Sequence, residues 1–137
     1  MDSADHLMGG QPAIILFAHG SAVEEANDGV RELARRIKQA GGYSFVRASF
    51  LGPGRPELGS AIHEAVDRGF RRIVVVPFFL TLGIHLRRDL PRLVEAEKEK
   101  YPDVDIQVGR SLEDHPEMVS LVLSRIREVT EETRVRP

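Results

Sequence analysis

Two histidines in this sequence stand where a metal ion or a proton could be handled. His19 directly follows an apolar run and precedes Gly20 and Ser21, and His85 follows a second apolar run after a short segment that contains glycine. Neutral imidazole is a good ligand for Fe²⁺, Co²⁺ and Ni²⁺, and it accepts a proton near neutral pH. Two such rings with no third strong ligand would make an open, weak metal site, which suits a metal that is passed on rather than kept.

A structural role remains the commoner one for either histidine alone, because a histidine at a strand end more often caps or packs than binds a ligand. The functional interpretation requires both rings to reach one crevice. Other histidines are weaker candidates: His63 is expected to face solvent, and His115 either borders the crevice or caps a helix. Ser21 lies beside His19, but no acidic partner is indicated for a nucleophile–base pair.

Arg87, Arg88 and Asp89 follow His85 directly. The two guanidinium groups would suit a substrate that carries carboxylates, because the arginine fork binds a carboxylate through two parallel hydrogen bonds. The alternative is that these residues form the solvent-exposed start of a helix, with an Arg–Asp ion pair and no ligand. The sequence by itself somewhat favours that alternative.

Apolar runs and helical spacings alternate along the chain. Strands are predicted at 13–18, 43–51, 73–80 and 104–108, and helices at 24–40, 56–68 and 90–101. A last helix is predicted to start within Asp114-His115-Pro116-Glu117, where Asp114 is the capping acid, and to run to about Thr130. For the third helix, Asp89 is the expected cap and Pro91 suits the first turn. His85 then falls in the preceding loop.

This alternation predicts an α/β fold with three layers, in which a four-stranded parallel sheet of order 2-1-3-4 has helices on both faces. The first and third strands are the most apolar, which favours them for the centre. Ligands of such sheets bind beyond the carboxyl ends of the strands where the winding reverses, here between strands one and three. That crevice would hold His19 and His85. We expect one domain at 13–131, a flexible leader at 1–12 and a polar tail at 132–137.

Composition excludes several function classes. The chain has 137 residues, and 19 Lys+Arg against 21 Asp+Glu give a net charge of −2, so a strongly basic nucleic-acid binder is not indicated. It has no cysteine, which excludes disulfides and thiolate metal sites. Neither a membrane-spanning run nor a signal peptide is evident, so a cytoplasmic protein without a membrane partner is expected. Glycine-rich nucleotide loops are also missing, and no organic cofactor is expected.

Three segments of this sequence resemble the CbiX/SirB-type sirohydrochlorin chelatases. They are Phe17-Ala18-His19-Gly20-Ser21, then Ser49-Phe50-Leu51, then the third predicted strand with Gly83-Ile84-His85-Leu86-Arg87-Arg88-Asp89-Leu90-Pro91. Asp114-His115-Pro116 resembles the family's later His-Pro element. The likeness covers about residues 13–130, and the length is similar to that of the short single-domain form, which pairs as a homodimer.

The resemblance implies insertion of a divalent metal (cobalt, iron or nickel, as a substrate) into sirohydrochlorin or a related tetrapyrrole without ATP. It places the family's two metal-binding, catalytic histidines at His19 and His85. The predicted contacts with the tetrapyrrole fall on arginines, apolar side chains and polar neighbours of the histidines: Arg87, Arg88, Phe78, Phe79, Leu82, Ser21 and His115.

One departure from the family pattern concerns acid–base chemistry. After the second strand the family usually carries a glutamate and, a few residues on, another glutamate before a proline, whereas Gly52 and Arg55 stand here. The alternative function is therefore a non-catalytic protein of the same fold that binds metal or tetrapyrrole and has lost its acidic catalytic residue.

Overall fold

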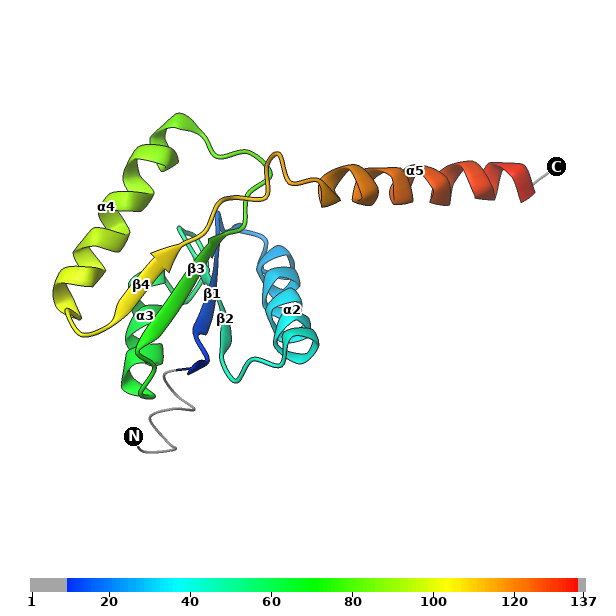
Figure 1. Ribbon diagram of the computed structural model, residues 1–137. Helices are drawn as coiled ribbons and strands as arrows, with labels where there is room; N and C mark the ends of the chain where they lie inside the picture. The colour runs from blue at the N-terminus through cyan, green and yellow to red at the C-terminus, as the bar shows by residue number, and fades with distance from the viewer. Residues whose placement is uncertain (1–9, 136–137) are drawn as a thin grey trace.

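Four parallel strands form one sheet in the order β2-β1-β3-β4, as the sequence predicts (Figure 1). The computed structural model describes residues 10–135, with side chains described to residue 131. The strands are β1 (Ala13–Ala18), β2 (Val46–Phe50), β3 (Arg72–Pro77) and β4 (Asp105–Val108), and the helices are α2 (Glu24–Gly41), α3 (Leu58–Asp67), α4 (Ile84–Lys100) and α5 (Glu117–Val135).

The strand β1 lies in the interior of the sheet and all six of its residues are buried. It pairs with β2, where Ile14 lies opposite Val46, and with β3, where Ile14 lies opposite Val74. An unbroken apolar run is what a strand covered on both faces requires. β3 ends at Pro77, earlier than the predicted residue 80, because proline has no N–H to continue the ladder.

The two faces of the sheet are covered unequally. The helices α3 and α4 pack on one face, where Leu58, Ile62, Leu90 and Val94 join strand residues such as Ile15 in the larger core cluster. On the opposite face, α2 packs through Ala34 and its neighbours against β1 and β2 in a smaller cluster. The predicted layers are therefore present, and the face that carries α2 has less helical cover.

Two helices differ from the sequence prediction. The helix α4 begins at Ile84, six residues before the predicted Leu90, so His85 lies in a helix rather than in a loop. Asp89 is therefore an exposed residue inside α4 and not its cap, and Pro91 lies inside the helix. α5 extends to Val135, beyond the predicted Thr130, and projects away from the sheet (Figure 1).

Most of the predicted leader, residues 1–9 with His6, lies outside the described residues, as do residues 136–137 at the other end. Among the described helices, none is long and apolar enough to cross a membrane.

Candidate functional site

Both predicted histidines lie at the carboxyl edge of the sheet. His19 is the first residue after β1, and His85 is the second residue of α4, which follows β3 through residues 78–83. Because β1 and β3 are adjacent and parallel, the segments after them share this edge. Both side chains are exposed. The fold thus brings the two histidine-bearing segments to one edge, and joint metal binding by their rings stays a prediction.

The ring of His19 rests on the segment that leads to His85. Its centroid lies 6.4 Å from that of Phe79 in an edge-on arrangement with an interplanar angle of 71°. Phe79 in turn packs edge-on against Phe17, with centroids 6.0 Å apart. Phe78, its neighbour, packs instead with the α2-side cluster. Of the two predicted aromatic contacts, Phe79 is therefore the one that touches a candidate metal ligand.

The segment after β1 is packed against the segment after β2. The backbone N–H of Gly52 donates to the carbonyl of His19 at 3.1 Å. Gly20 has a φ of 90°, and a Cβ added there would lie 2.1 Å from the carbonyl oxygen of Pro53. Only glycine satisfies both conditions, since a side chain would clash and would disfavour that φ. The Gly20 of the His-Gly-Ser motif therefore permits close contact between two loops.

Asn27 clamps the loop that carries His19, and the sequence analysis missed it. Its side chain is 1% exposed, its Oδ1 accepts from the Ser21 N–H at 2.9 Å and its Nδ2 donates to the Ser21 carbonyl at 2.8 Å. The Ser21 hydroxyl accepts from the N–H of Val23 at 3.0 Å. Ser21 is thus engaged in forming this turn through its backbone and its hydroxyl.

Arg31 on α2 binds the loop that follows β2, so the same helix holds both loops. Its Nη2 donates to the carbonyl of Arg55 at 2.8 Å, and its guanidinium lies 5.2 Å from the ring centre of Phe50. Its Nη1 lies 2.6 Å from Glu24. The hydrogen bond from Arg31 holds the pKa of the Glu24 carboxyl below its usual range, so this pair is charged at neutral pH.

Arg87 holds the segment before α4 instead of pointing freely into solvent. Its Nε donates to the carbonyl of Leu82 at 2.9 Å, and its Nη2 lies 3.3 Å from Glu113. Arg87 and Leu82 line a cavity of about 340 Å³ whose other walls are Arg110, Ser111, Glu113 and Asp114. Arg88 is exposed on α4. Arg110 is a second cation on this cavity that sequence reasoning did not single out.

His115 caps the start of α5, which was one of its two predicted roles. Its Nδ1 accepts from the N–H of Glu117 at 3.1 Å. Asp114, predicted as the capping acid, has a φ of 64°, a left-handed conformation that makes the turn. A substrate contact by His115 remains a prediction.

Gly52 and Arg55, the two positions at which the family resemblance leads us to expect glutamate, lie in the loop after β2, and the N–H of Gly52 bonds to the carbonyl of His19. Gly52 has a φ of 131°, where a side chain is disfavoured. Arg55 points its Nη1 at Glu57, 2.5 Å from Oε1. Glu57 is exposed and pairs with Phe50 through an isolated bridge, so it supplies a carboxylate at this edge.

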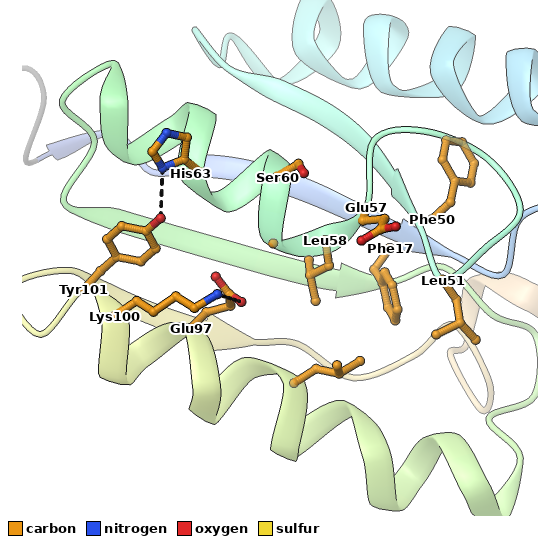
Figure 2. Close-up of a pocket in the computed structure, with 12 residues that line it drawn as sticks. Phe17, Phe50, Leu51, Glu57, Leu58, Ser60, His63, Glu97, Lys100 and Tyr101 are labelled. Atoms are coloured by element: carbon orange, nitrogen blue, oxygen red, sulfur yellow. Dashed lines mark hydrogen bonds and ion pairs between the residues drawn. The ribbon is translucent and has the colours of Figure 1, made fainter.

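A groove of about 570 Å³ runs between α3 and α4 from this edge (Figure 2). Phe17, Leu51 and Glu57 line its end near the carboxyl edge, and His63 and Tyr101 line the other end (Figure 2). The His63 Nδ1 lies 2.9 Å from the Tyr101 hydroxyl. His63 is exposed, as predicted, and lies on a different part of the molecule from His19. Within residues 10–135, no three acidic or histidine side chains are grouped to hold a metal ion.

Comparisons with known proteins agree with this architecture. A model of the CbiX family matches residues 13–129. The sirohydrochlorin cobaltochelatase of Methanopyrus kandleri is 27% identical over 136 residues, covering 85% of this chain and 95% of that protein.

Two solved structures have the same fold. A putative cobalamin biosynthesis CbiX protein from Marinobacter aquaeolei VT8 has a TM-score of 0.77 at 25% identity, covering 88% of this chain and 98% of that one. The sirohydrochlorin chelatase SirB from Bacillus subtilis subspecies spizizenii, in complex with cobalt, has a TM-score of 0.79 at 25% identity. That match covers 87% of this chain and 51% of SirB, so the chain spans about half of some relatives and nearly all of others.

Proposed function

Because the chain belongs to the CbiX family, we propose that it is a sirohydrochlorin chelatase, which inserts a divalent metal into sirohydrochlorin or a related tetrapyrrole without ATP. The observation that carries the proposal is the convergence of the two histidine-bearing segments at the carboxyl edge of β1 and β3. The names of relatives, cobaltochelatase and ferrochelatase, support cobalt and iron as metal substrates. Nickel also suits imidazole ligands.

In this proposal, His19 and His85 hold the incoming metal through neutral ring nitrogens, with open coordination positions directed at the macrocycle. Insertion displaces two pyrrole protons: an imidazole that has released the metal accepts one of them at its free nitrogen, and the other passes to water. The ring of Phe79 packs edge-on against the ring of His19 and so helps to position it. A weak site with two protein ligands releases the metal readily, which a transfer reaction requires.

The tetrapyrrole carries peripheral carboxylates, for which Arg87 and Arg88 supply the charge. Arg87 already bonds to Leu82 and Glu113, so its contribution is a guanidinium held in place beside the cavity. Arg110 adds a further positive charge to the same cavity. Glu57 takes the acid–base role that Gly52 and Arg55 cannot fill. The family resemblance further implies a homodimer in the cytoplasm.

The test measures insertion and metal binding separately. Sirohydrochlorin is incubated with Co²⁺, Fe²⁺ or Ni²⁺ and the change of its absorbance is followed with and without the protein. His19→Ala and His85→Ala are expected to lower both the insertion rate and the affinity for Co²⁺. His63→Ala is the matched control, because it removes another exposed histidine from α3.

Insertion no faster than the uncatalysed reaction with every metal would contradict the chelatase proposal. If Co²⁺ or tetrapyrrole still bound in a manner sensitive to His19→Ala, the binding protein without catalysis would be the correct function. Equal Co²⁺ affinities of the His19→Ala, His85→Ala and His63→Ala variants would remove the proposed metal site.

A further inference from the structure

The groove between α3 and α4 contains a buried carboxylate that the proposed function does not use. Glu97 on α4 is 9% exposed, and within residues 10–131 it is the only charged residue that is buried. Asn27 and Ser49, the other buried polar residues of that range, donate hydrogen bonds to backbone carbonyls. Charged side chains are seldom buried without partners, because removing a charge from water is costly. The surroundings of Glu97 therefore indicate what it can bind.

Only one oxygen of the Glu97 carboxylate has a partner in the described part of the chain. The Nζ of Lys100, three residues along α4, donates to Oε2 at 3.2 Å. Oε1 has no such partner there, and it is open to the groove, since no fully enclosed side-chain oxygen of the described residues lacks a hydrogen bond. The side chain of Lys100 is 63% exposed, so its ammonium group can return to water. A carboxylate accepts several hydrogen bonds, and this one is left with room for more.

Gly59 on α3 leaves the space in front of this carboxylate free. A Cβ added at Gly59 would lie 3.2 Å from Oε2 and 3.6 Å from Oε1 of Glu97, so a side chain at this position would crowd both oxygens. Figure 2 shows the carboxylate pointing from α4 towards α3. The Tyr101 hydroxyl, which is paired with the Nδ1 of His63 at 2.9 Å, lines the same end of the groove. This end is therefore polar and accessible.

The rest of the groove is mainly apolar. Leu58, Phe17 and Leu51 follow one another from the region of Glu97 to the carboxyl edge of the sheet (Figure 2). Glu57, at the edge end, is paired with Arg55 at 2.5 Å, so its charge is compensated. The groove volume of about 570 Å³ lies in the range of about 300–1,000 Å³ found for small-molecule sites. The groove thus combines one buried negative charge with an apolar trough of the size that a small molecule requires.

We propose that this groove binds a small apolar amine. The ammonium group of the ligand replaces that of Lys100 at Glu97, and its hydrocarbon body lies along the apolar trough. An ammonium donates charge-assisted hydrogen bonds to a carboxylate, and the hydrocarbon is stabilised by leaving water. An anionic ligand would instead be repelled by Glu97. Neither His19 nor His85 lines the groove, so the proposal goes beyond the chelatase function and does not depend on it.

The first test compares two probes of equal length, hexylamine and hexanol. Each is titrated to millimolar concentration into the full chain labelled with ¹⁵N, and the amide chemical shifts are followed by NMR. Hexylamine is expected to bind about tenfold more tightly than hexanol, because only the amine forms a charge-assisted bond with Glu97. The amide shifts are expected to concentrate in 58–63 of α3 and 93–101 at the end of α4, which line the groove.

The second test uses substitutions with opposite expected effects. Glu97→Gln keeps the size of the side chain and should abolish the preference for hexylamine, whereas Lys100→Ala should tighten hexylamine binding severalfold by removing the competing ammonium group. Lys98→Ala is the matched control, because Lys98 lies on the same helix and pairs with Glu95 at 3.8 Å. Gly59→Ala fills the space in front of the carboxylate and should weaken hexylamine binding. Circular dichroism melting curves verify that each variant is folded.

Three results would overturn the amine site: equal affinities for hexylamine and hexanol, hexylamine binding that persists in Glu97→Gln, or amide shifts confined to other elements. Weaker hexylamine binding in Lys100→Ala would overturn it as well, because Lys100 would then belong to the site instead of competing for it. A failure of metal insertion would leave all of these measurements unchanged, so this proposal and the chelatase proposal fail separately.

Discussion

The clamp formed by Asn27 gives the sharpest test of how the site is held. Replacing Asn27 with alanine removes two hydrogen bonds of 2.9 and 2.8 Å to the backbone of Ser21 from a side chain that is 1% exposed. Each bond contributes about 1 kcal/mol net, and a polar group left without a partner costs about 1–3 kcal/mol. Because Ser21 is only half-buried, water can replace part of the lost bonding. We therefore expect a loss of about 2 kcal/mol in the free energy of unfolding.

Urea denaturation followed by circular dichroism measures this loss. A change of about 2 kcal/mol lowers the midpoint by roughly 1 M urea when the slope is about 2 kcal/mol per M. Gln39→Ala, at an exposed position of the same helix, should change the free energy by less than about 0.5 kcal/mol. In the insertion assay, Asn27→Ala should also lower the rate, since the loop before it carries His19. If Asn27→Ala matched Gln39→Ala in both assays, the amide would not be holding the loop.

Three further substitutions probe the same edge of the sheet. Gly20→Ala should lose about 1–3 kcal/mol, because its Cβ would meet the Pro53 carbonyl at 2.1 Å at a φ of 90°, with a fall in Tm of roughly 5–10 °C. Gly42→Ala, which meets nothing within 4 Å at its φ of 70°, should cost less, and an equal loss would contradict the loop contact. Phe79→Ala should lower both stability, by about 2–4 kcal/mol, and Co²⁺ affinity, whereas Phe78→Ala on the other face should lower stability alone. Arg87→Ala should change stability by less than about 1 kcal/mol, since its ion pair is largely exposed, but raise the KM for sirohydrochlorin about tenfold; an unchanged KM would remove Arg87 from substrate binding.

The sheet order could be predicted because burial on two faces leaves a direct mark on the sequence. The runs Ala13–Ala18 and Ile73–Pro77 are apolar without alternation, and both strands lie in the interior of the sheet. The positions of His19 and His85 at one edge then follow from the topology alone.

The beginning of α4 could not be predicted because its first turns have no buried stripe. Ile84 is 74% exposed, and the run from His85 to Asp89 is largely exposed and polar, so helical periodicity appears only from Leu90 onward. The backbone, however, is already helical from Ile84, and the carbonyl of Gly83, the residue before the helix, accepts from the N–H of Arg87 at 2.9 Å. Pro91 was interpreted as a first-turn residue, although it lies in the second turn of the longer helix.

The burial of Asn27 could have been predicted from the helical periodicity of α2. It precedes Val30 by three residues and Ala34 by seven, so it falls on the face of α2 that packs against the sheet. A polar residue on a buried helical face needs hydrogen-bond partners, and the nearby turn at Ser21 provides them. The inference was available from spacing, but which backbone groups the amide would bond required coordinates.

Hydrogen bonds from side chains to the backbone position the loops that form the candidate site. Asn27 holds the loop after β1, Arg31 holds the loop after β2, and Arg87 holds the segment after β3 through the carbonyl of Leu82. Each support comes from a side chain outside the proposed metal site, so the two histidines stay exposed and free to exchange ligands. Under the proposed function, the metal is bound and then transferred to the macrocycle. The three supports would position the two histidines, and a site with only two protein ligands would bind the metal weakly enough to release it. A third ligand added at the edge should therefore tighten metal binding and slow its release.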